Sequence, residues 1–487
     1  MKPRYLICIL FIVTAVASCV KKADIWERAK VNEVKLLSFG FYKADNPDLL
    51  IKDFVIKQVN SNNLTVLLPA DVDRTKLKAR FTVGENDITR VGGVVQKSGE
   101  TSNDFTVPVD YFLSDGNYNA KYTVTIVKGG DFVWSPIPFT LEDSAVAEVM
   151  KVSPVTGFPY IMYKQSRPSS SDARAAMASF ENNEWVNKGT ISDGVIGSYF
   201  DFTFNNTGAP YVTYTDNSAT VAQANTVKMF DGAAWTTLGS RGFTPVKVTY
   251  NALAFDNDGK LQVFTTVDAA GGGFVRRELA VGIWSNNSWS LAKLPVRAST
   301  MVTYRQVAKF KNNAVYLGIY NAITPNSISV YKYENNTWST LMNAWKDPNG
   351  TSISLYDIDI EVDDDGNVYT ALADNSSSGT VKHRVIKYDA ATQTVSPVGG
   401  YIVGSGASSM SLDLALSPIG TPYLFFKNSS NHPTLISFDN ETQDWAIPHV
   451  FETEVAEELS LDFAPNGDAY ATYIKKNKLM IYKYSTP

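Results

Sequence analysis

A tyrosine recurs at one position of a repeated unit in the C-terminal part of the chain, nine or ten residues before a turn residue that is usually glycine. The successive occupants of this position are Tyr199, Tyr250, Tyr304, Tyr356, Met410 and Glu458. Tyrosine rings stack on the faces of sugars, and their hydroxyl groups hydrogen-bond to sugar hydroxyls. Four consecutive tyrosines therefore predict either a glycan-binding ring or an aromatic plug that only packs.

Three further residues near these tyrosines have side chains suited to ligand binding. Arg305 and Asp357 each follow a tyrosine of the series, and Trp345 lies in a long predicted loop. The charged residues could hydrogen-bond to a polar ligand, and the indole could serve as a flat platform. We therefore expect one binding site made of Tyr199, Tyr250, Tyr304, Arg305, Tyr356, Asp357 and Trp345.

The chain has three histidines, His383, His432 and His449. Histidine binds zinc and acts as a general acid or base near neutral pH, but these three follow no metal-binding spacing and equally suit solvated loops. Carboxylates in the predicted inner strands could bind a cation or hydrogen-bond to neighbouring strands: Asp201, Asp359, Glu361, Asp413 and Asp462. We expect hydrogen bonding there, no cofactor, and a binding protein rather than an enzyme.

These residues belong to a repeat of about 50 residues that fills the segment 143–487. Each unit has a Gly-x-x-Tyr motif, such as Gly208–Tyr211, and most have a tryptophan after a polar turn, such as Trp185. The pattern predicts four strands in each of seven units. Such units bury their faces against one another in a ring, so we expect a seven-bladed β-propeller with the tyrosines and tryptophans packed between blades.

The seventh unit ends at Pro487 before its fourth strand. Either this unit has three strands, or the segment Trp134–Leu141, which is similar to the missing strand, completes it. We assign Trp134–Leu141 to the preceding domain.

The predicted connections differ in length between the two faces of the ring. The turns that carry the glycines of the Gly-x-x-Tyr motif are short. The other face has the long connections Lys164–Ala176, Asp216–Thr226, Val267–Glu278, Met342–Leu355 and Tyr401–Ser409. Hairpins need only a few residues, and additional loop length is often functional. We therefore place the site on the long-loop face.

Residues 29–142 contain six or seven short predicted strands, which is typical of a β-sandwich. Three stretches carry a family resemblance: Ser38–Phe41 with Asn46-Pro47, Leu68–Asp73, and Gln96–Gly99 with Asp104-Phe105. They resemble an immunoglobulin-like module at the N-terminus of Bacteroidetes outer-membrane lipoproteins. The resemblance implies a spacer or a binding platform, and its motifs are packing and turn positions without a reactive residue.

The N-terminus has the pattern of an export signal. Residues 1–18 combine two basic residues with an apolar run, and Val16–Cys19 resembles the lipobox of bacterial lipoproteins. This resemblance implies a signal peptide over 1–18, lipidation of Cys19, a linker over 19–28 and anchoring in the outer membrane. The residues after Cys19 lack the acidic run that is associated with surface display, so the side of the membrane stays open.

Composition agrees with a folded all-β protein. The 487 residues include 44% hydrophobic and 12% aromatic residues with 31 glycines and 21 prolines, which favours strands and turns. The net charge is −5 and no basic run stands out, so we expect no nucleic-acid partner. The two cysteines are Cys8 and Cys19, so the body of the chain has no disulfide or cysteine-based site.

The pairing of such a module with a propeller resembles Bacteroidetes proteins that accompany polysaccharide uptake systems. This resemblance implies a glycan as the ligand of a lipid-anchored, non-catalytic protein. Two alternatives remain open: a scaffold that binds an envelope protein by the same face, and a lyase or hydrolase that acts on polysaccharide.

Overall fold

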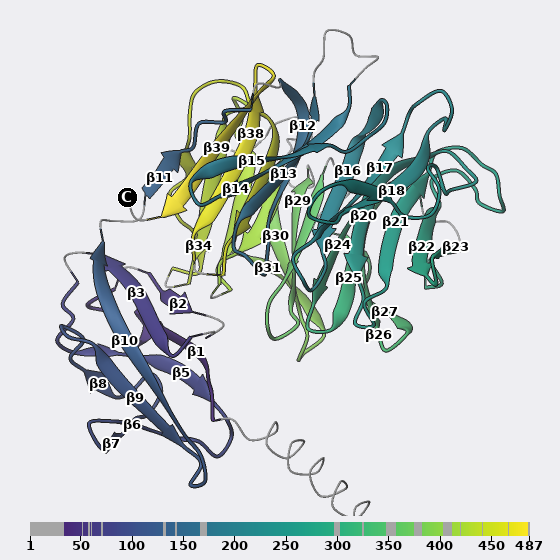
Figure 1. Cartoon of the computed structure of the whole chain (residues 1–487). Coiled ribbons are helices and arrows are strands. Elements are labelled where there is room, and N and C mark those ends of the chain that lie inside the picture. Colours follow the sequence, from purple (N-terminus) through teal and green to yellow (C-terminus); the bar gives the residue numbers. More distant parts are fainter. Residues whose placement is uncertain are drawn as a thin grey trace, which may run out of the picture. The chain divides into compact units, whose positions relative to one another are not determined.

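The computed structural model describes residues 34–485 except for residues 51, 57–58, 60, 70–71, 130–132, 142–143, 166–172, 297–301, 324–325, 347–356, 375–381, 403–411, 419, 441 and 466. The signal sequence and Cys19 lie outside this part. The chain divides into two compact units. Unit 1 ends at Asp131, and unit 2 begins at Phe132. The described part consists of strands and one 3-10 turn at Lys43–Asp45, which confirms the all-β class (Figure 1). In the same residues, no helix has the length and hydropathy that a membrane span requires.

Unit 1 contains two larger sheets. The first has the order β2-β1-β5, with β1 (Leu36–Phe41), β2 (Phe54–Ile56) and β5 (Arg80–Val83). The second has the order β3-β10-β9-β6-β7, with β3 (Asn63–Pro69), β6 (Ile88–Val91), β7 (Val94–Val95), β9 (Val109–Ser114) and β10 (Asn119–Gly129). The short strands β4 (Leu77–Lys78) and β8 (Ser102–Asn103) pair with each other. Aromatic rings from both sheets meet edge to face, with Phe39 lying 5.3 Å from Tyr111.

The stretches behind the family resemblance have packing and turn roles, as expected. The buried Asn46 amide donates hydrogen bonds to the carbonyls of Tyr42 and Lys78, each at 2.9 Å, and accepts one from the Lys78 N–H at 2.8 Å. The Ser98 hydroxyl accepts a hydrogen bond from the Phe81 N–H at 2.8 Å and donates one to the Phe81 carbonyl at 2.7 Å. These polar side chains fix loops against strands, and none of them is free for chemistry.

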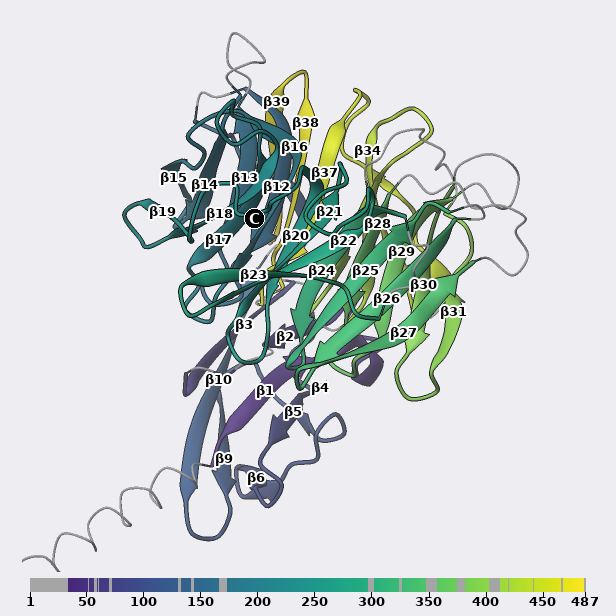
Figure 2. The ribbon, with the colours of Figure 1, turned by 90° about the vertical axis from the view of Figure 1, so that its right-hand side faces the viewer.

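Unit 2 consists of antiparallel sheets that stand side by side (Figure 2). The first three contain β12 (Ala145–Val152), β13 (Pro159–Gln165), β14 (Ala175–Glu181) and β15 (Glu184–Thr190); β16 (Ile196–Phe204), β17 (Pro210–Asp216), β18 (Ala224–Phe230) and β19 (Trp235–Thr237); and β20 (Val248–Phe255), β21 (Leu261–Val267), β22 (Leu279–Ser285) and β23 (Ser288–Lys293). The next two contain β24 (Thr303–Lys311), β25 (Ala314–Asn321), β26 (Ser327–Glu334) and β27 (Thr337–Trp345), and β28 (Ile358–Val362), β29 (Val368–Asp374), β30 (Lys382–Asp389) and β31 (Thr394–Val398). The sixth contains β32 (Leu412–Leu416), β33 (Pro422–Lys427), β34 (Pro433–Asp439), β35 (Asp444–Trp445) and β36 (His449–Val450), and the seventh includes β37 (Glu457–Phe463), β38 (Ala469–Lys475) and β39 (Lys478–Ser485).

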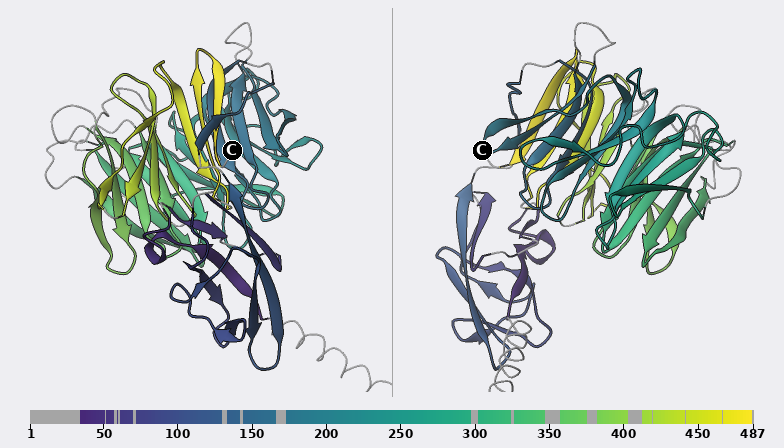
Figure 3. Two further views of the ribbon diagram at one scale, coloured as in Figure 1. Left: turned by 90° about the vertical axis from the view of Figure 1, so that its left-hand side faces the viewer. Right: turned by 45° about the vertical axis from the view of Figure 1, so that its right-hand side comes forward.

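The first strand of each sheet faces a common centre. These strands contact one another in the cyclic order β12, β16, β20, β24, β28, β32, β37 and back to β12 (Figure 3). Carboxylates on them accept hydrogen bonds from backbone N–H groups of the next inner strand, such as Asp201 from Leu253 at 3.3 Å and Asp413 from Leu461 at 2.6 Å. Asp462 accepts one from Val152 at 2.7 Å, and this bond joins the last sheet to the first. These three carboxylates thus pair inner backbone N–H groups that the strand ladders leave without a partner.

The seventh sheet takes its outer strand from the other end of the unit. β11 (Val133–Pro136) pairs with β39, and Trp134 lies opposite Tyr484 (Figure 1). Our assignment of Trp134–Leu141 to the preceding domain, and with it the domain boundary at 142/143, is therefore wrong. The Trp134 ring lies 5.1 Å from the rings of both Phe451 and Tyr484, so pairing in this sheet covers an aromatic side chain. The alternative that we set aside, completion of the last unit by this segment, is what the structure shows.

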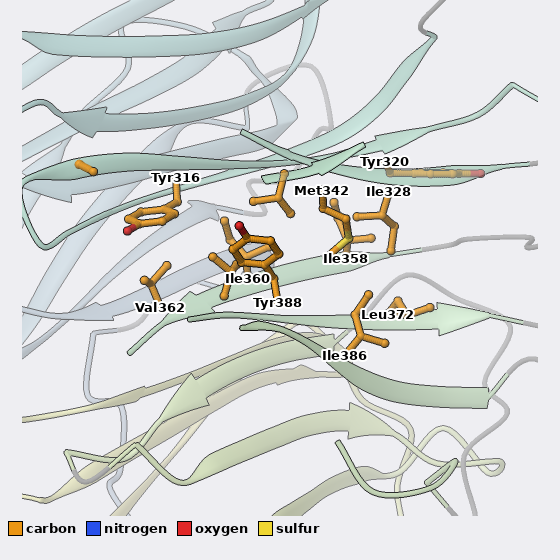
Figure 4. Close-up of a cluster of buried hydrophobic side chains, with 13 residues drawn as sticks. Tyr316, Tyr320, Ile328, Met342, Ile358, Ile360, Val362, Leu372, Ile386 and Tyr388 are labelled. Carbon is orange, nitrogen blue, oxygen red and sulfur yellow. The ribbon is translucent and has the colours of Figure 1, made fainter. Parts of the chain in front are cut away.

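The repeated tryptophans join neighbouring sheets, as expected. The indole Nε1 groups of Trp185, Trp235 and Trp289 donate hydrogen bonds of 2.8 Å to the carbonyls of Pro138, Lys188 and Leu238, which precede them by about 50 residues. Apolar side chains fill the space between sheets, and Figure 4 shows one such cluster, in which Tyr316 and Met342 from one sheet pack with Ile360 and Tyr388 from the next. At this contact Gly318 faces Ile360 so closely that a methyl group on it would lie 2.6 Å from Ile360 Cγ2.

Candidate functional site

The repeated tyrosine position is a β-bulge at the start of the inner strand. The pairing of inner and second strands shifts by a residue at Tyr250, Tyr304 and Glu458, and a longer irregularity between Ile196 and Phe200 includes Tyr199. Tyr250 and Glu458 have positive φ angles of 41° and 49°, which bulky residues rarely adopt. A bulge redirects a side chain out of the regular sheet, and such residues are frequent beside functional sites.

We define the rim as Tyr199, Tyr250, Tyr304 and Glu458, which lie where the long connections lead into the inner strands. Tyr356 and Met410, which we expected at the equivalent positions, lie outside the described residues. The sequence identified the position by its periodicity. It did not predict the bulge, because a register shift leaves no period of its own in the side-chain pattern.

Side chains of the following sheet hold the backbone of the rim. The Asn251 amide donates a hydrogen bond to the Tyr199 carbonyl at 2.9 Å, and the Gln306 amide donates one to the Tyr250 carbonyl. A bulge leaves backbone groups without ladder partners, and these two amides supply them. The fold therefore holds the backbone of Tyr199 and Tyr250 in place without a ligand.

Tyr199 and Tyr250 form a packed pair. Their ring centroids lie 4.1 Å apart with an interplanar angle of 42°. Burial raises the pKa of Tyr199, and the adjacent Tyr250 acts in the same direction, so the hydroxyl of Tyr199 stays protonated and can donate a hydrogen bond. The pair is thus both a packing element and a source of hydroxyl groups.

Tyr304 is the most accessible aromatic residue of the rim, with 40% of its surface exposed. The Arg277 guanidinium lies 4.5 Å from the Tyr304 centroid and 5.8 Å from the Tyr250 centroid. Cation–π attraction to both rings holds the arginine between them. Tyr199, Tyr250, Arg277 and Tyr304 therefore form a continuous aromatic row. Sequence reasoning missed Arg277, whose signal was only its place in the long connection Val267–Glu278.

Arg305 and Asp357 form the ion pair of the site. Arg305 Nε lies 2.7 Å from Asp357 Oδ1, and the exposed fractions of the two side chains are 32% and 3%. Asp357 also accepts hydrogen bonds from the N–H groups of Ile358 at 3.0 Å and Leu412 at 3.4 Å. Burial raises the pKa of Asp357, whereas the Arg305 charge opposes this rise. Asp357 positions Arg305, and the Arg305 side chain lines the two cavities described next.

A mouth cavity of about 500 Å³ adjoins the rim. Its polar lining includes Ser198, Tyr199, Arg305, Asp357, Lys427, Asn431, Glu457 and Glu458. This volume lies in the range of small-ligand sites. Tyr304 does not line the cavity, so the aromatic row extends the site beyond it. Lys427, Glu457 and Glu458 were not among the predicted site residues, although the tyrosine period includes Glu458.

A deeper channel cavity of about 150 Å³ continues along the inner strands. The cations in it are already paired, because Lys151 Nζ lies 2.6 Å from Asp201 Oδ1 and Lys309 Nζ lies 2.5 Å from Glu361 Oε1. Burial and the neighbouring Asp359 carboxylate raise the pKa of Asp413 well above its ordinary value. The predicted inner-strand carboxylates are thus engaged in ion pairs and inter-sheet hydrogen bonds.

Trp345 belongs to a different cluster from the rim. It lies at the end of the outer strand β27, where the Arg384 guanidinium lies 4.9 Å from its ring and 5.2 Å from that of Tyr401. In the described part of the chain, no ring contact or cation–π contact joins Trp345 to Arg305 or to the rim tyrosines. The structure therefore brings together Tyr199, Tyr250, Tyr304, Arg305 and Asp357, and leaves Trp345 apart.

The three histidines occupy unlike environments. His383 on β30 is buried, its ring lies 4.9 Å from the Phe426 ring, and burial lowers its pKa to about 3. His432 lies in the turn before β34, and His449 is exposed on β36 with its ring 4.7 Å from Phe451. Within the described residues, no group of three His, Cys, Asp or Glu side chains is arranged to hold a metal ion.

Comparison with known proteins gives a family match for unit 1 and fold similarities for unit 2. Residues 50–126 match the family model described as SGBP, N-terminal. A search of curated proteins found no match. Among solved structures, a lectin from Burkholderia pseudomallei aligns with a TM-score of 0.52 and 9% identity over 71% of this chain and 96% of the lectin. At that identity the likeness concerns the fold alone.

Two other solved structures align with lower scores. An ulvan lyase has a TM-score of 0.48 and 10% identity over 72% of this chain and 96% of its own. A protein of unknown function from Dyadobacter fermentans has a TM-score of 0.44 and 10% identity over 73% of this chain and 98% of its own.

Proposed function

We propose that this protein binds a glycan at the rim and the adjoining mouth cavity. The observation that carries the proposal is the fixed aromatic row of Tyr199, Tyr250 and Tyr304, with Arg277 between the last two, beside a polar cavity of about 500 Å³. Sugars present apolar ring faces edged by hydroxyl groups, so they bind surfaces that combine aromatic rings with hydrogen-bonding groups.

The family match supports this proposal. SGBP denotes a surface glycan-binding protein of Bacteroidetes type, and the matched residues 50–126 belong to unit 1. Polar side chains in that unit, such as Asn46 and Ser98, are engaged in packing and turns. We therefore assign glycan binding to unit 2 and a spacer role to unit 1. The lectin that aligns with this chain supports the proposal that such a fold binds sugar.

The same proposal includes the finer architecture and the location. We infer that the sheets of unit 2 form a seven-bladed β-propeller and that unit 1 is an immunoglobulin-like sandwich. Residues 1–18 and Cys19 have the pattern of a lipoprotein signal, so the protein is proposed to be lipid-anchored in the outer membrane and held by the linker 19–28.

Each rim residue has a proposed role. Tyr304 serves as the stacking platform because it is exposed and Arg277 supports one of its faces. Arg305 donates hydrogen bonds to ring or hydroxyl oxygens, and Asp357 fixes its orientation. Tyr199 and Tyr250 supply hydroxyl groups at the edge of the cavity. The role is non-catalytic: the channel carboxylates are engaged with cations and backbone N–H groups, and the three histidines occupy separate environments.

Affinity gels that contain single polysaccharides, run with the mature chain lacking its lipid anchor, test the proposal. Retardation by at least one polysaccharide is expected. Tyr304→Ala is expected to weaken binding by about five-fold, because aromatic contacts contribute about 1 kcal/mol each beyond their buried area. Phe310→Ala is the matched control, since Phe310 is an equally exposed aromatic residue near the opposite end of the same strand.

The outcomes separate the alternatives. Equal weakening by Tyr304→Ala and Phe310→Ala contradicts a site at the rim. Absence of binding to every polysaccharide contradicts glycan binding and favours the scaffold that holds an envelope protein. Release of new reducing ends or unsaturated sugars from any polysaccharide contradicts the non-catalytic role.

A further inference from the structure

The mouth cavity has an excess of carboxylates over cations. Its charged lining consists of the acids Asp357, Glu457 and Glu458 and the bases Arg305 and Lys427. The channel below it adds the acids Asp201, Asp359 and Asp462 against Lys151 and Lys309. Burial raises the pKa of Glu148 to about 8 and that of Asp413 well above its ordinary value, so these two carboxyl groups add little negative charge near neutral pH. A ligand at the rim therefore meets a net negative field from both levels.

The cations of these two cavities are engaged by the protein. Arg305 is paired with Asp357 at 2.7 Å, Lys151 with Asp201 at 2.6 Å and Lys309 with Glu361 at 2.5 Å. Lys427 is buried. Burial lowers its pKa, and the nearby carboxylates of Glu458 and Glu457 oppose this shift by attracting its charge. An anionic group on a ligand would have to compete with these internal carboxylates for each cation, and it would lose hydration in doing so.

Two acids of the mouth, in contrast, are open to the ligand. Glu457 and Glu458 are both exposed, and no ion pair with either is found in the described part of the chain. Glu458 occupies the bulge position that Tyr250 and Tyr304 occupy in other sheets, and its positive φ of 49° directs it away from the regular strand. A carboxylate there accepts hydrogen bonds from hydroxyl groups and repels a second carboxylate or a sulfate.

We propose, resting on glycan binding at the rim, that the site selects uncharged glycans and rejects glycans with carboxylate or sulfate groups, with Glu458 as the residue that sets this selectivity. Glu458 accepts hydrogen bonds from the hydroxyls of a neutral sugar chain that lies along the aromatic row. Glu457 adds to the repulsion of acidic chains. Specificity then comes from an unfavourable contact with the wrong ligand as well as from favourable contacts with the right one.

The test uses polysaccharide pairs that differ mainly in charge. Methyl-esterified and de-esterified homogalacturonan form one pair, and hydroxyethyl and carboxymethyl cellulose form another. Neutral plant and microbial glucans, galactans and mannans and the acidic polymers alginate and carrageenan complete the panel. Binding of the mature chain is measured by affinity gel and calorimetry at low and high salt and at pH 8. The walls of the cavity displace part of the water around the Glu458 carboxyl and raise its pKa to about 7, and pH 8 lies above this value, so Glu458 is mostly ionised in the test.

The proposal expects at least one neutral polymer to bind and its acidic counterpart to bind at least ten-fold more weakly at low salt. Glu458→Gln is expected to strengthen binding of the acidic counterpart by about three- to ten-fold, since it removes a unit charge that repels the acidic groups of the ligand in a partly hydrated site. Binding of the neutral polymer is expected to weaken by about three- to ten-fold, because the neutral amide oxygen accepts hydrogen bonds from sugar hydroxyls less strongly than the carboxylate does. Glu334→Gln, at the end of β26 that lies away from the rim, is the control for net charge and should alter neither.

The possible results separate three statements: that the site binds glycans, that it prefers neutral ones, and that Glu458 causes this preference. Equal or tighter binding of acidic polymers by the wild type overturns the selectivity while glycan binding stands. A neutral preference that Glu458→Gln leaves unchanged, alone and combined with Glu457→Gln, overturns the role of Glu458. Absence of binding to every polymer in the panel overturns both the proposed function and this inference. Thermal unfolding midpoints of the variants within a few degrees of wild type exclude misfolding as the cause.

Discussion

Replacement of Glu148 by glutamine is expected to remove a large part of the pH dependence of stability of unit 2. Glu148 lies on the inner strand β12 with 3% of its surface exposed. The Ser460 hydroxyl, on β37, donates a hydrogen bond to Glu148 Oε2 at 3.2 Å and accepts one from the Met150 N–H at 3.1 Å. This network lies at the junction of the last and the first sheet of the ring.

Burial raises the pKa of Glu148 from 4.5 to about 8, and the charge of Glu458 acts in the same direction, whereas hydroxyl groups of Thr472 and Ser460 oppose it. The folded state therefore keeps a proton that the unfolded chain releases above pH 4.5. The stabilisation is fully present below that pH and is lost as the pH rises through 8. At about 1.4 kcal/mol per pKa unit, Glu148 lowers the free energy of unfolding by about 4 kcal/mol between pH 5 and pH 8.

Urea unfolding at pH 5, 6, 7 and 8, followed by tryptophan fluorescence, measures this effect. All tryptophans except Trp26 lie in unit 2, so the signal reports on the ring. Glutamine mimics the neutral carboxyl group and keeps an acceptor for Ser460, so Glu148→Gln should match wild type within about 1 kcal/mol at pH 5 and exceed it by several kcal/mol at pH 8. Glu184→Gln, at an exposed position of β15, is the control. Parallel pH profiles for wild type and Glu148→Gln would refute the reasoning.

Three further predictions concern the joints between sheets. Trp235→Phe removes the 2.8 Å hydrogen bond to the Lys188 carbonyl and should destabilise unit 2 by about 1–2 kcal/mol in urea unfolding, with no effect expected from replacing the solvent-exposed Ile447 by alanine. A fragment that begins at residue 138 lacks β11 and should unfold at a clearly lower temperature than one that begins at residue 132; equal midpoints would show that β11 adds no stability. Gly318→Ala places a methyl group 2.6 Å from Ile360 Cγ2 and should cost about 1–3 kcal/mol, and the loss should shrink when Ile360 is also replaced by alanine.

Much of the architecture could be predicted from the sequence because it repeats. The tryptophans of successive units have equivalent partners, each a backbone carbonyl about 50 residues earlier. Trp185 and Trp235 therefore mark equivalent contacts between neighbouring sheets. The partner of Trp134–Leu141 could not be predicted, because the segment has the pattern of a strand and pattern alone does not select between two sheets. Pairing with β39 became clear only in three dimensions.

The candidate site was predictable in part for a related reason. The period marked Tyr199, Tyr250 and Tyr304 as equivalent, and the structure places all three at bulges or irregularities of inner strands. Arg277 does not lie at a repeated position of the sequence, and only the fold places its guanidinium between the rings of Tyr250 and Tyr304. Glu458 did share the period, but a carboxylate among tyrosines resembled an exception until its exposed position at the mouth cavity was known. Trp345 was grouped with the rim by loop length alone, which does not measure distance across a ring.

The pairing of β11 with β39 also sets the order in which the ring can fold. Val133 pairs with Ser485, so these partners are separated by nearly the whole of unit 2. The closure of so long a loop is entropically costly and slow, and it rewards the chain only after the intervening sheets have formed. During synthesis, β11 emerges before the other strands of unit 2, and Trp134 stays uncovered until the C-terminal strand β39 is made. Ring closure is therefore the last step of folding, and a chain truncated by a few residues at its C-terminus keeps every other sheet but leaves the first-made strand of unit 2 without its partner.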